Sequence, residues 1–174
     1  EAALSALREA DRILETRPRW AWARAWRGWT LLQLGRYPEA RVSLLAAARA
    51  ARHPWIMVWR AQAELGLLRH AAALEAVEEA LRREPSYALA HVLRGEALRG
   101  LSRLREAELS LGRAVALDPL CAPAHYGLAR VQSNMRRYGK AAGSARQALR
   151  IMPEHREAAA LLSELERGSA GAAR

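Results

Sequence analysis

The sequence predicts an all-α solenoid built from helix-turn-helix hairpins, and three ladders of residues at a fixed period predict it. Prolines recur every 34 residues at Pro85, Pro119 and Pro153. Two ladders of small residues keep the same phase at steps of 33 or 34: Ala40, Ala73, Ala107 and Ala141, and Gly28, Ala61, Gly95 and Ala129. A period of this length indicates stacked supersecondary elements, each of which packs only on its neighbours.

The repeat at 88–119 shows why each element is a hairpin. Its apolar residues recur every three to five positions, a helical spacing, in two runs: Val92, Leu93, Leu98 and Leu101, then Leu104, Leu109, Leu111 and Val115. Gly100 and Ser102 separate the runs, and Pro119 ends the second, because proline cannot continue a helix. Where the two helices approach most closely, we expect Gly95 to face Ala107.

The ladders divide the chain into four hairpins between two single helices. The boundaries are 1–18, the second helix of a truncated repeat; 19–53, 54–87, 88–121 and 122–154, the four hairpin repeats; 155–167, a polar capping helix; and 168–174, a disordered tail. A polar helix suits the exposed end of a repeat array. One irregular turn is expected before the second repeat, because Pro54 lies two residues past the place that the proline ladder assigns to it.

These hairpins resemble the tetratricopeptide repeat (TPR), which has the same period and the same pattern of small residues and proline. The third repeat is similar in Arg94-Gly95, Leu98, Ala107, Leu111, Ala114 and Pro119, and the fourth in Leu128-Ala129, Tyr138, Ala141, Ala148 and Pro153. The resemblance implies a right-handed solenoid whose first helices line a concave groove. Where the family usually has Leu, this chain has Arg27, Arg60 and Arg94, which we expect to contact acidic side chains or helix carbonyls.

Tryptophan is the strongest local signal. All six lie in the first third of the chain: Trp20, Trp22, Trp26, Trp29, Trp55 and Trp59. The resemblance implies these groove and partner-binding residues: Trp22, Trp26, Trp29, Trp55, Trp59, Gln62, Val92, Glu96, Arg99, Tyr126 and Arg130. The alternative is that the rings fill the core in place of the absent Phe, and for Trp26 and Trp59 both roles are equally supported. Exposed Trp is typical of binding hot spots.

No catalytic or metal signature is present, so we predict no enzyme and no cofactor. The sequence has no Gly-rich phosphate loop, no zinc-binding helix motif and no nucleophile elbow. His91 and His125 occupy equivalent places, but helices pack about 8 to 10 Å apart, too far for a shared zinc ion without further ligands. Cys121 starts a helix without a neighbouring base, which favours a packing role over a reactive thiol.

The leading function is therefore a non-enzymatic scaffold that binds a peptide, a helix or a partner subunit in a Trp-rich groove. A substrate-docking or regulatory domain of a larger enzyme or secretion machine is the first alternative. A binder of RNA or another polyanion is the second, because the net charge is +10, although the spread of arginines favours solvated helix faces. Exposed tryptophans could also pair two copies of the chain.

Compartment is only weakly constrained. No apolar run approaches the length that spans a bilayer as a helix, so no membrane span is expected. The chain starts at Glu1 without a Met, so any targeting segment could lie outside it. The single cysteine suits a reducing compartment, and we favour a cytoplasmic location.

Overall fold

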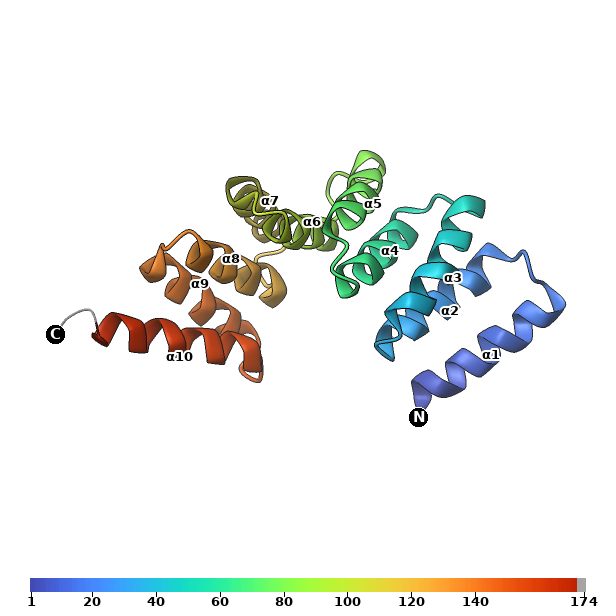
Figure 1. The fold of residues 1–174 in the computed structure, drawn as a ribbon, viewed down its shortest axis with the longest axis horizontal. Helices are drawn as coiled ribbons and strands as arrows, with labels where there is room; N and C mark the ends of the chain where they lie inside the picture. The colour runs from blue at the N-terminus through green and yellow to red at the C-terminus, as the bar shows by residue number, and fades with distance from the viewer. Residues whose placement is uncertain (172–174) are drawn as a thin grey trace. The chain divides into compact units, whose positions relative to one another are not determined.

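The computed structural model describes residues 1–171, which form ten α-helices and no strand (Figure 1). The helices are α1 (Ala2–Thr16), α2 (Ala21–Gln33), α3 (Tyr37–Ala50), α4 (Pro54–Gly66), α5 (His70–Arg83), α6 (Ala88–Gly100), α7 (Leu104–Leu117), α8 (Ala122–Asn134), α9 (Tyr138–Ile151) and α10 (Arg156–Gly171). Two compact units contain them: α1 to α5 in unit 1 (Glu1–Pro85) and α6 to α10 in unit 2 (Ser86–Arg174). The predicted all-α helical-repeat fold is confirmed.

Each unit contains two hairpins and one single helix. In unit 1, α2 packs on α3 and α4 on α5, while α1 packs on α2; in unit 2, α6 packs on α7 and α8 on α9, while α10 packs on α9. Three residues join the helices of each hairpin, and the middle one has a positive φ: Gly35, Leu68, Ser102 and Arg136. This left-handed residue lets the next N–H reach the last helical turn, as when Arg69 N donates to Glu64 O at 2.8 Å.

The irregular step around Pro54 has a simple structural cause. Four residues link one hairpin or single helix to the next elsewhere in each unit, and the second of them is always a proline: Pro18, Pro119 and Pro153. Between α3 and α4 only residues 51–53 remain, and Pro54 is the first residue of α4. Proline is well suited to that position, because its missing N–H would have no helical partner there. The first and second repeats are therefore 33 residues apart, and not 34, because the linker between α3 and α4 is one residue shorter than the others.

Two glycines of the ladder Gly28, Ala61, Gly95 and Ala129 leave space for a leucine on the facing helix of the same hairpin. A Cβ atom at Gly28 would lie 2.5 Å from the Leu44 side chain, and one at Gly95 would lie 2.5 Å from that of Leu111. Both leucines are fully buried on the second helix of the same hairpin. A side chain at Gly95 would first meet Leu111, which lies one helical turn beyond Ala107 on the same helix.

The C-terminal boundary also moves. Helix α10 continues to Gly171, so residues 168–171, which were predicted as part of a disordered tail, are helical. The rest of that predicted tail, residues 172–174, lies outside the described residues. Leu165 of α10 packs on Ala141 and Ala142 of α9 and thereby covers the last hairpin.

The arginines that replace the family's Leu are partly buried and hydrogen-bonded in two of three cases. Arg27 Nε donates to Asp11 Oδ1 at 2.6 Å, and its Nη1 donates to Ser43 Oγ at 2.7 Å. Arg94 Nη1 makes the equivalent bond to Ser110 Oγ, also 2.7 Å long. The α4–α5 hairpin differs: there the serine is replaced by Ala76 and the Nε of Arg60 finds no hydrogen-bond partner within the described chain.

Candidate functional site

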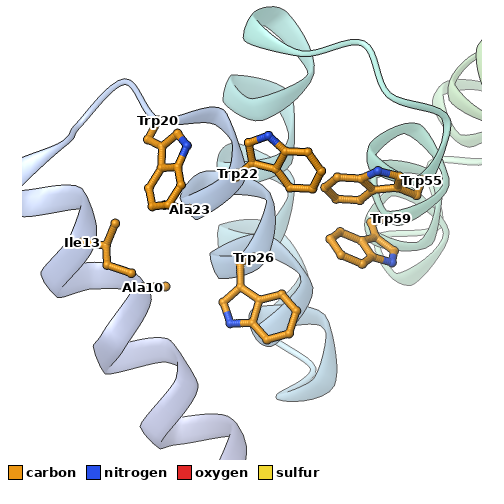
Figure 2. A pocket seen from close by; sticks show the side chains of 8 residues that line it. All are labelled: Ala10, Ile13, Trp20, Trp22, Ala23, Trp26, Trp55 and Trp59. Carbon is orange, nitrogen blue, oxygen red and sulfur yellow. The ribbon is translucent and has the colours of Figure 1, made fainter.

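Five indoles in unit 1 surround an open cavity of about 550 Å³. Its lining residues come from α1, the loop before α2, α2 and α4: Ala10, Ile13, Trp20, Trp22, Ala23, Trp26, Trp55 and Trp59 (Figure 2). We call this cavity the aromatic pocket. Apart from the indole N–H groups, no lining side chain carries a polar atom.

Helical spacing and the repeat together build the aromatic pocket. Steps of three and four residues place Trp22, Trp26 and Trp29 on one face of α2. The 33-residue repeat places Trp55 and Trp59 at the same two positions of α4 as the first two, and α4 contacts α2 directly. Two rows of rings on neighbouring helices thus face the same side.

The rings contact one another rather than standing alone. Ring centroids are 5.0 Å apart for Trp22 and Trp55, and 4.5 Å apart for Trp55 and Trp59, which meet edge to face. Trp29 contacts both rows, because its ring is stacked on that of Trp26 at 4.8 Å and lies 6.0 Å from that of Trp59. Such pairs contribute about 0.5 to 1.5 kcal/mol each. The cluster is therefore held in place before any ligand binds.

None of the six tryptophans is buried, so filling the core is not their role. Trp20, Trp22 and Trp26 expose 43%, 55% and 48% of their area, and the other three are half-buried. The core of unit 1 consists instead of small and aliphatic side chains such as Leu31, Leu44 and Ile56. Between the two roles left open for Trp26 and Trp59, their positions in the wall of the cavity favour the surface role.

The structure distributes the predicted site residues over two separate places. Four of the predicted tryptophans line the aromatic pocket: Trp22, Trp26, Trp55 and Trp59. Trp29 and Gln62 are half-buried and lie outside the lining, Gln62 on the same face of α4 as Trp55 and Trp59. The sequence did not identify Ala10 and Ile13 of α1 as part of the wall. Their only signal is helical spacing in the truncated first repeat. The groove assignment of Val92 was wrong, because its side chain is buried and only 5% exposed.

The remaining predicted residues lie in unit 2, around a second cavity of about 480 Å³ that we call the polar pocket. Its lining residues are Arg99, Tyr126, Arg130, Ser133, Asn134, Glu157, Ala160, Leu161 and Glu164, from α6, α8 and α10. Glu96 holds both arginines: its Oε2 lies 2.9 Å from Arg130 Nη1 and 3.2 Å from Arg99 Nη2. These two cations are thus already paired inside the protein.

Tyr126 completes the polar pocket as a neutral, partly buried ring. The guanidinium of Arg130 lies 5.4 Å from the centre of its ring, and the His155 ring lies 4.7 Å away. Burial raises the pKa of the Tyr126 phenol, so the hydroxyl stays protonated at neutral pH. The polar pocket therefore offers hydrogen bonds and compensated charges.

Nothing in the described residues adds a metal or redox centre. No group of three His, Cys, Asp or Glu side chains lies close enough together to hold a metal ion within that part of the chain. Burial raises the pKa of the Cys121 thiol, which favours its protonated form. Among the described residues, no helix is both long enough and apolar enough to cross a membrane.

Comparison with known proteins agrees with this architecture. A model of the tetratricopeptide repeat family matches residues 60–119 and 97–156. No curated protein matches the chain. Among solved structures, TTC0263, a thermophilic TPR protein of Thermus thermophilus, is 24% identical, with 94% of this chain and 90% of that chain covered and a TM-score of 0.79.

Two further solved structures have the same fold. MamA from Desulfovibrio magneticus RS-1, from its residue 41 to the end, is 20% identical, with 88% of this chain and 87% of that chain covered and a TM-score of 0.75. YrrB, described as a TPR protein with an unusual peptide-binding site, is 23% identical, with 90% and 81% covered and a TM-score of 0.71. At these identities the likeness establishes the fold alone.

Proposed function

The chain belongs to the tetratricopeptide repeat family, whose members are generally non-catalytic protein-interaction scaffolds, and we propose that this member binds an apolar peptide or helix of a partner protein in its aromatic pocket. One observation carries the proposal: five indoles that could have been buried instead line an open, apolar cavity. Water in contact with so much apolar surface is released when a ligand covers it.

The size of that surface is enough for specific binding. An indole of about 200 Å² that loses half its area contributes about 2.5 kcal/mol at about 25 cal/mol per Å². Trp20, Trp22 and Trp26 each expose close to half of their area. The free energy gained by covering all three therefore offsets a substantial part of the free-energy cost of association. Because the rings already contact one another, little ordering is needed on the protein's side.

A selection from random peptides displayed on phage tests the proposal. Peptides selected on the full chain are measured against the parent protein and a Trp22→Ala/Trp55→Ala variant. We expect the variant to bind about 100-fold more weakly, about 2.7 kcal/mol, because both rings belong to the pocket wall. The matched control is Tyr138→Ala, which removes a ring that is 52% exposed in unit 2 and should leave affinity unchanged.

Circular dichroism separates lost binding from lost folding. Trp22 is 55% exposed, so its removal leaves no core cavity and the helical signal should persist. The proposal is wrong if the selected peptides bind parent and double variant equally.

A further inference from the structure

Acidic residues are almost absent from the part of the chain that carries the tryptophans. Between Glu15 and Glu64 the only acidic residue is Glu39, against nine arginines: Arg17, Arg19, Arg24, Arg27, Arg36, Arg41, Arg49, Arg52 and Arg60. Glu39 is itself engaged, because Arg36 donates two hydrogen bonds of 2.6 Å to its two carboxylate oxygens. Helix α1, which also lines the pocket, adds acidic residues as well as Arg8 and Arg12, and residues 1–63 together still hold eleven arginines against five acidic residues. The surroundings of the aromatic pocket are therefore positive.

Five of these nine arginines have an acidic partner within unit 1, and four have none. Arg27, Arg36, Arg41, Arg52 and Arg60 lie within 4 Å of a carboxylate oxygen. Within the described chain, no ion pair engages the other four, which are Arg17, Arg19, Arg24 and Arg49. Uncompensated charges of one sign at one place attract a ligand of the opposite sign.

The four unpaired arginines gather at the end of α2 that carries the first tryptophans. Arg17 and Arg19 flank Pro18 in the loop before α2, and the Arg17 guanidinium lies 5.7 Å from the ring centre of Trp20, a wall of the aromatic pocket. Arg19, Arg24 and Arg49 line a hollow of about 310 Å³ with Ala46 and Ala50. Unpaired cations thus begin at the rim of the pocket and continue around the start of α2.

We propose that the occupant of the aromatic pocket is an acidic apolar peptide segment. Its apolar side chains contact the indoles, and its Asp or Glu carboxylates pair with Arg17, which lies against Trp20 at the rim, and with Arg19 on the other side of Pro18. The inference rests on the proposed function and adds the charge of the ligand to it. Charge complementarity of this kind raises the rate of association and excludes wrong partners.

Three other occupants fit the same surface less well. A second copy of the chain would bring the same unpaired arginines against each other. A cationic group would enter a pocket that has no carboxylate in its wall and arginine at its rim. A single nucleic acid strand could pair with the arginines, but the apolar wall offers the hydrogen-bonding edges of its bases only indole N–H groups.

The peptides selected for Trp-dependent binding are the probe. We expect them to be enriched in Asp and Glu over the unselected library. For the tightest binder, replacing each Asp by Asn and each Glu by Gln should weaken binding about 10-fold at 0.1 M salt, measured by fluorescence anisotropy of a labelled peptide. The difference should nearly vanish at 1 M salt, because the screening length falls from about 10 Å to about 3 Å.

Arginine variants locate the contact. Arg17→Gln/Arg19→Gln should lower the affinity for the acidic peptide several-fold and leave that for its amide counterpart unchanged. Arg82→Gln/Arg83→Gln removes the same charge from the last turn of α5 in unit 1 and is the matched control. Equal losses in both double variants would mean that net charge, and not the rim, attracts the peptide, which overturns the proposed contact.

The remaining outcomes separate the two proposals. If Trp-dependent peptides show no excess of Asp and Glu, or bind as well in amide form, the acidic ligand is refuted and the pocket stands. If a labelled oligothymidylate binds more tightly than any peptide and needs Trp22 and Trp55, the ligand is nucleic acid. If light scattering finds a dimer that the tryptophan variant abolishes, the ligand is a second copy. If no binder needs Trp22 and Trp55, both proposals fail.

Discussion

The aromatic pocket and the polar pocket are both lined by first helices of successive hairpins, but with opposite chemistry. Equivalent positions of the first helices of successive hairpins hold Trp29, Gln62, Glu96 and Arg130, and another set holds Trp26, Trp59, Leu93 and Gly127. In unit 2 the charges neutralise each other through Glu96, whereas in unit 1 large apolar area stays exposed. The repeated backbone therefore determines where a surface lies, and the side chains determine whether groups on that surface remain available to bind a ligand.

Substitutions placed in one unit at a time can be followed by two different spectroscopic signals. All six tryptophans lie in unit 1, so their fluorescence reports the unfolding of unit 1, while circular dichroism reports the helices of both units.

The buried carboxylate of unit 1 gives the largest expected effect. Glu64 is 1% exposed, and its oxygens lie 3.0 Å from Arg41 Nε and 2.9 Å from Arg69 Nε. Glu64→Ala removes the carboxylate partner of both arginines. Breaking a buried ion pair typically lowers the free energy of unfolding by about 3 to 5 kcal/mol, and we expect about 3 kcal/mol because both arginines are partly exposed. Urea unfolding followed by Trp fluorescence measures it. Glu108→Ala, which breaks a more exposed pair with Arg137 in unit 2 and is followed by circular dichroism, should lower stability far less.

Overpacking a hairpin should come second and should act in the unit that carries it. Gly28→Leu and Gly95→Leu each force a side chain into Leu44 or Leu111, at a typical cost of about 1 to 3 kcal/mol. The first variant should shift the fluorescence transition, and the second should shift the circular dichroism transition. Gly112→Leu, with open space around its Cβ, is the control. Unchanged midpoints in both glycine variants would refute the close approach.

Supplying the missing serine should stabilise unit 1. Ala76→Ser restores at the α4–α5 hairpin the hydroxyl that Arg27 and Arg94 use in theirs, and gives Arg60 an acceptor. One such bond contributes about 0.5 to 1.5 kcal/mol net, so we expect a gain of about 1 kcal/mol in unfolding free energy. In an Arg60→Met background the serine should give no gain. A gain that persists there would show that the hydroxyl acts without the arginine.

The smallest expected effect on stability comes from two equivalent ion pairs, Arg36–Glu39 in unit 1 and Arg103–Glu106 in unit 2, and it should be the same in both units. Arg36 lowers the pKa of Glu39, and Arg103 lowers that of Glu106, in both cases through a direct hydrogen bond. A lowered folded-state pKa stabilises the protein above the unfolded-state value of about 4.5, and the contribution is lost as pH falls through the folded-state value. Glu39→Gln and Glu106→Gln should each slightly flatten the acid side of the stability profile. A steeper profile in either would contradict the sign.

Helical spacing and the repeat period were sufficient to predict the hairpins from sequence, because Pro119 and Gly95 act through local backbone and packing rules. The ion pairs were harder. Glu96 and Arg130 are 34 residues apart, one full repeat, and the period could have indicated that they are neighbours. The groove assignment of Val92 failed because helical phase within the repeat was not resolved to a single residue. Helical spacing predicts α1 as the second helix of a truncated repeat, but it does not show that Ile13 of this helix lies close enough to the tryptophans to line the pocket.

The short linker between α3 and α4 separates the two rows of indoles without carrying one. His53, its last residue, lies with its ring 6.1 Å from that of Trp22 and 5.6 Å from that of Trp55. Inserting one residue after Arg52 would give this linker the length found elsewhere in the array and would leave every ring in the sequence. The length of this linker thus helps to set the distance between the two rows of indoles, so the added residue should change the width of the aromatic pocket while all six tryptophans remain.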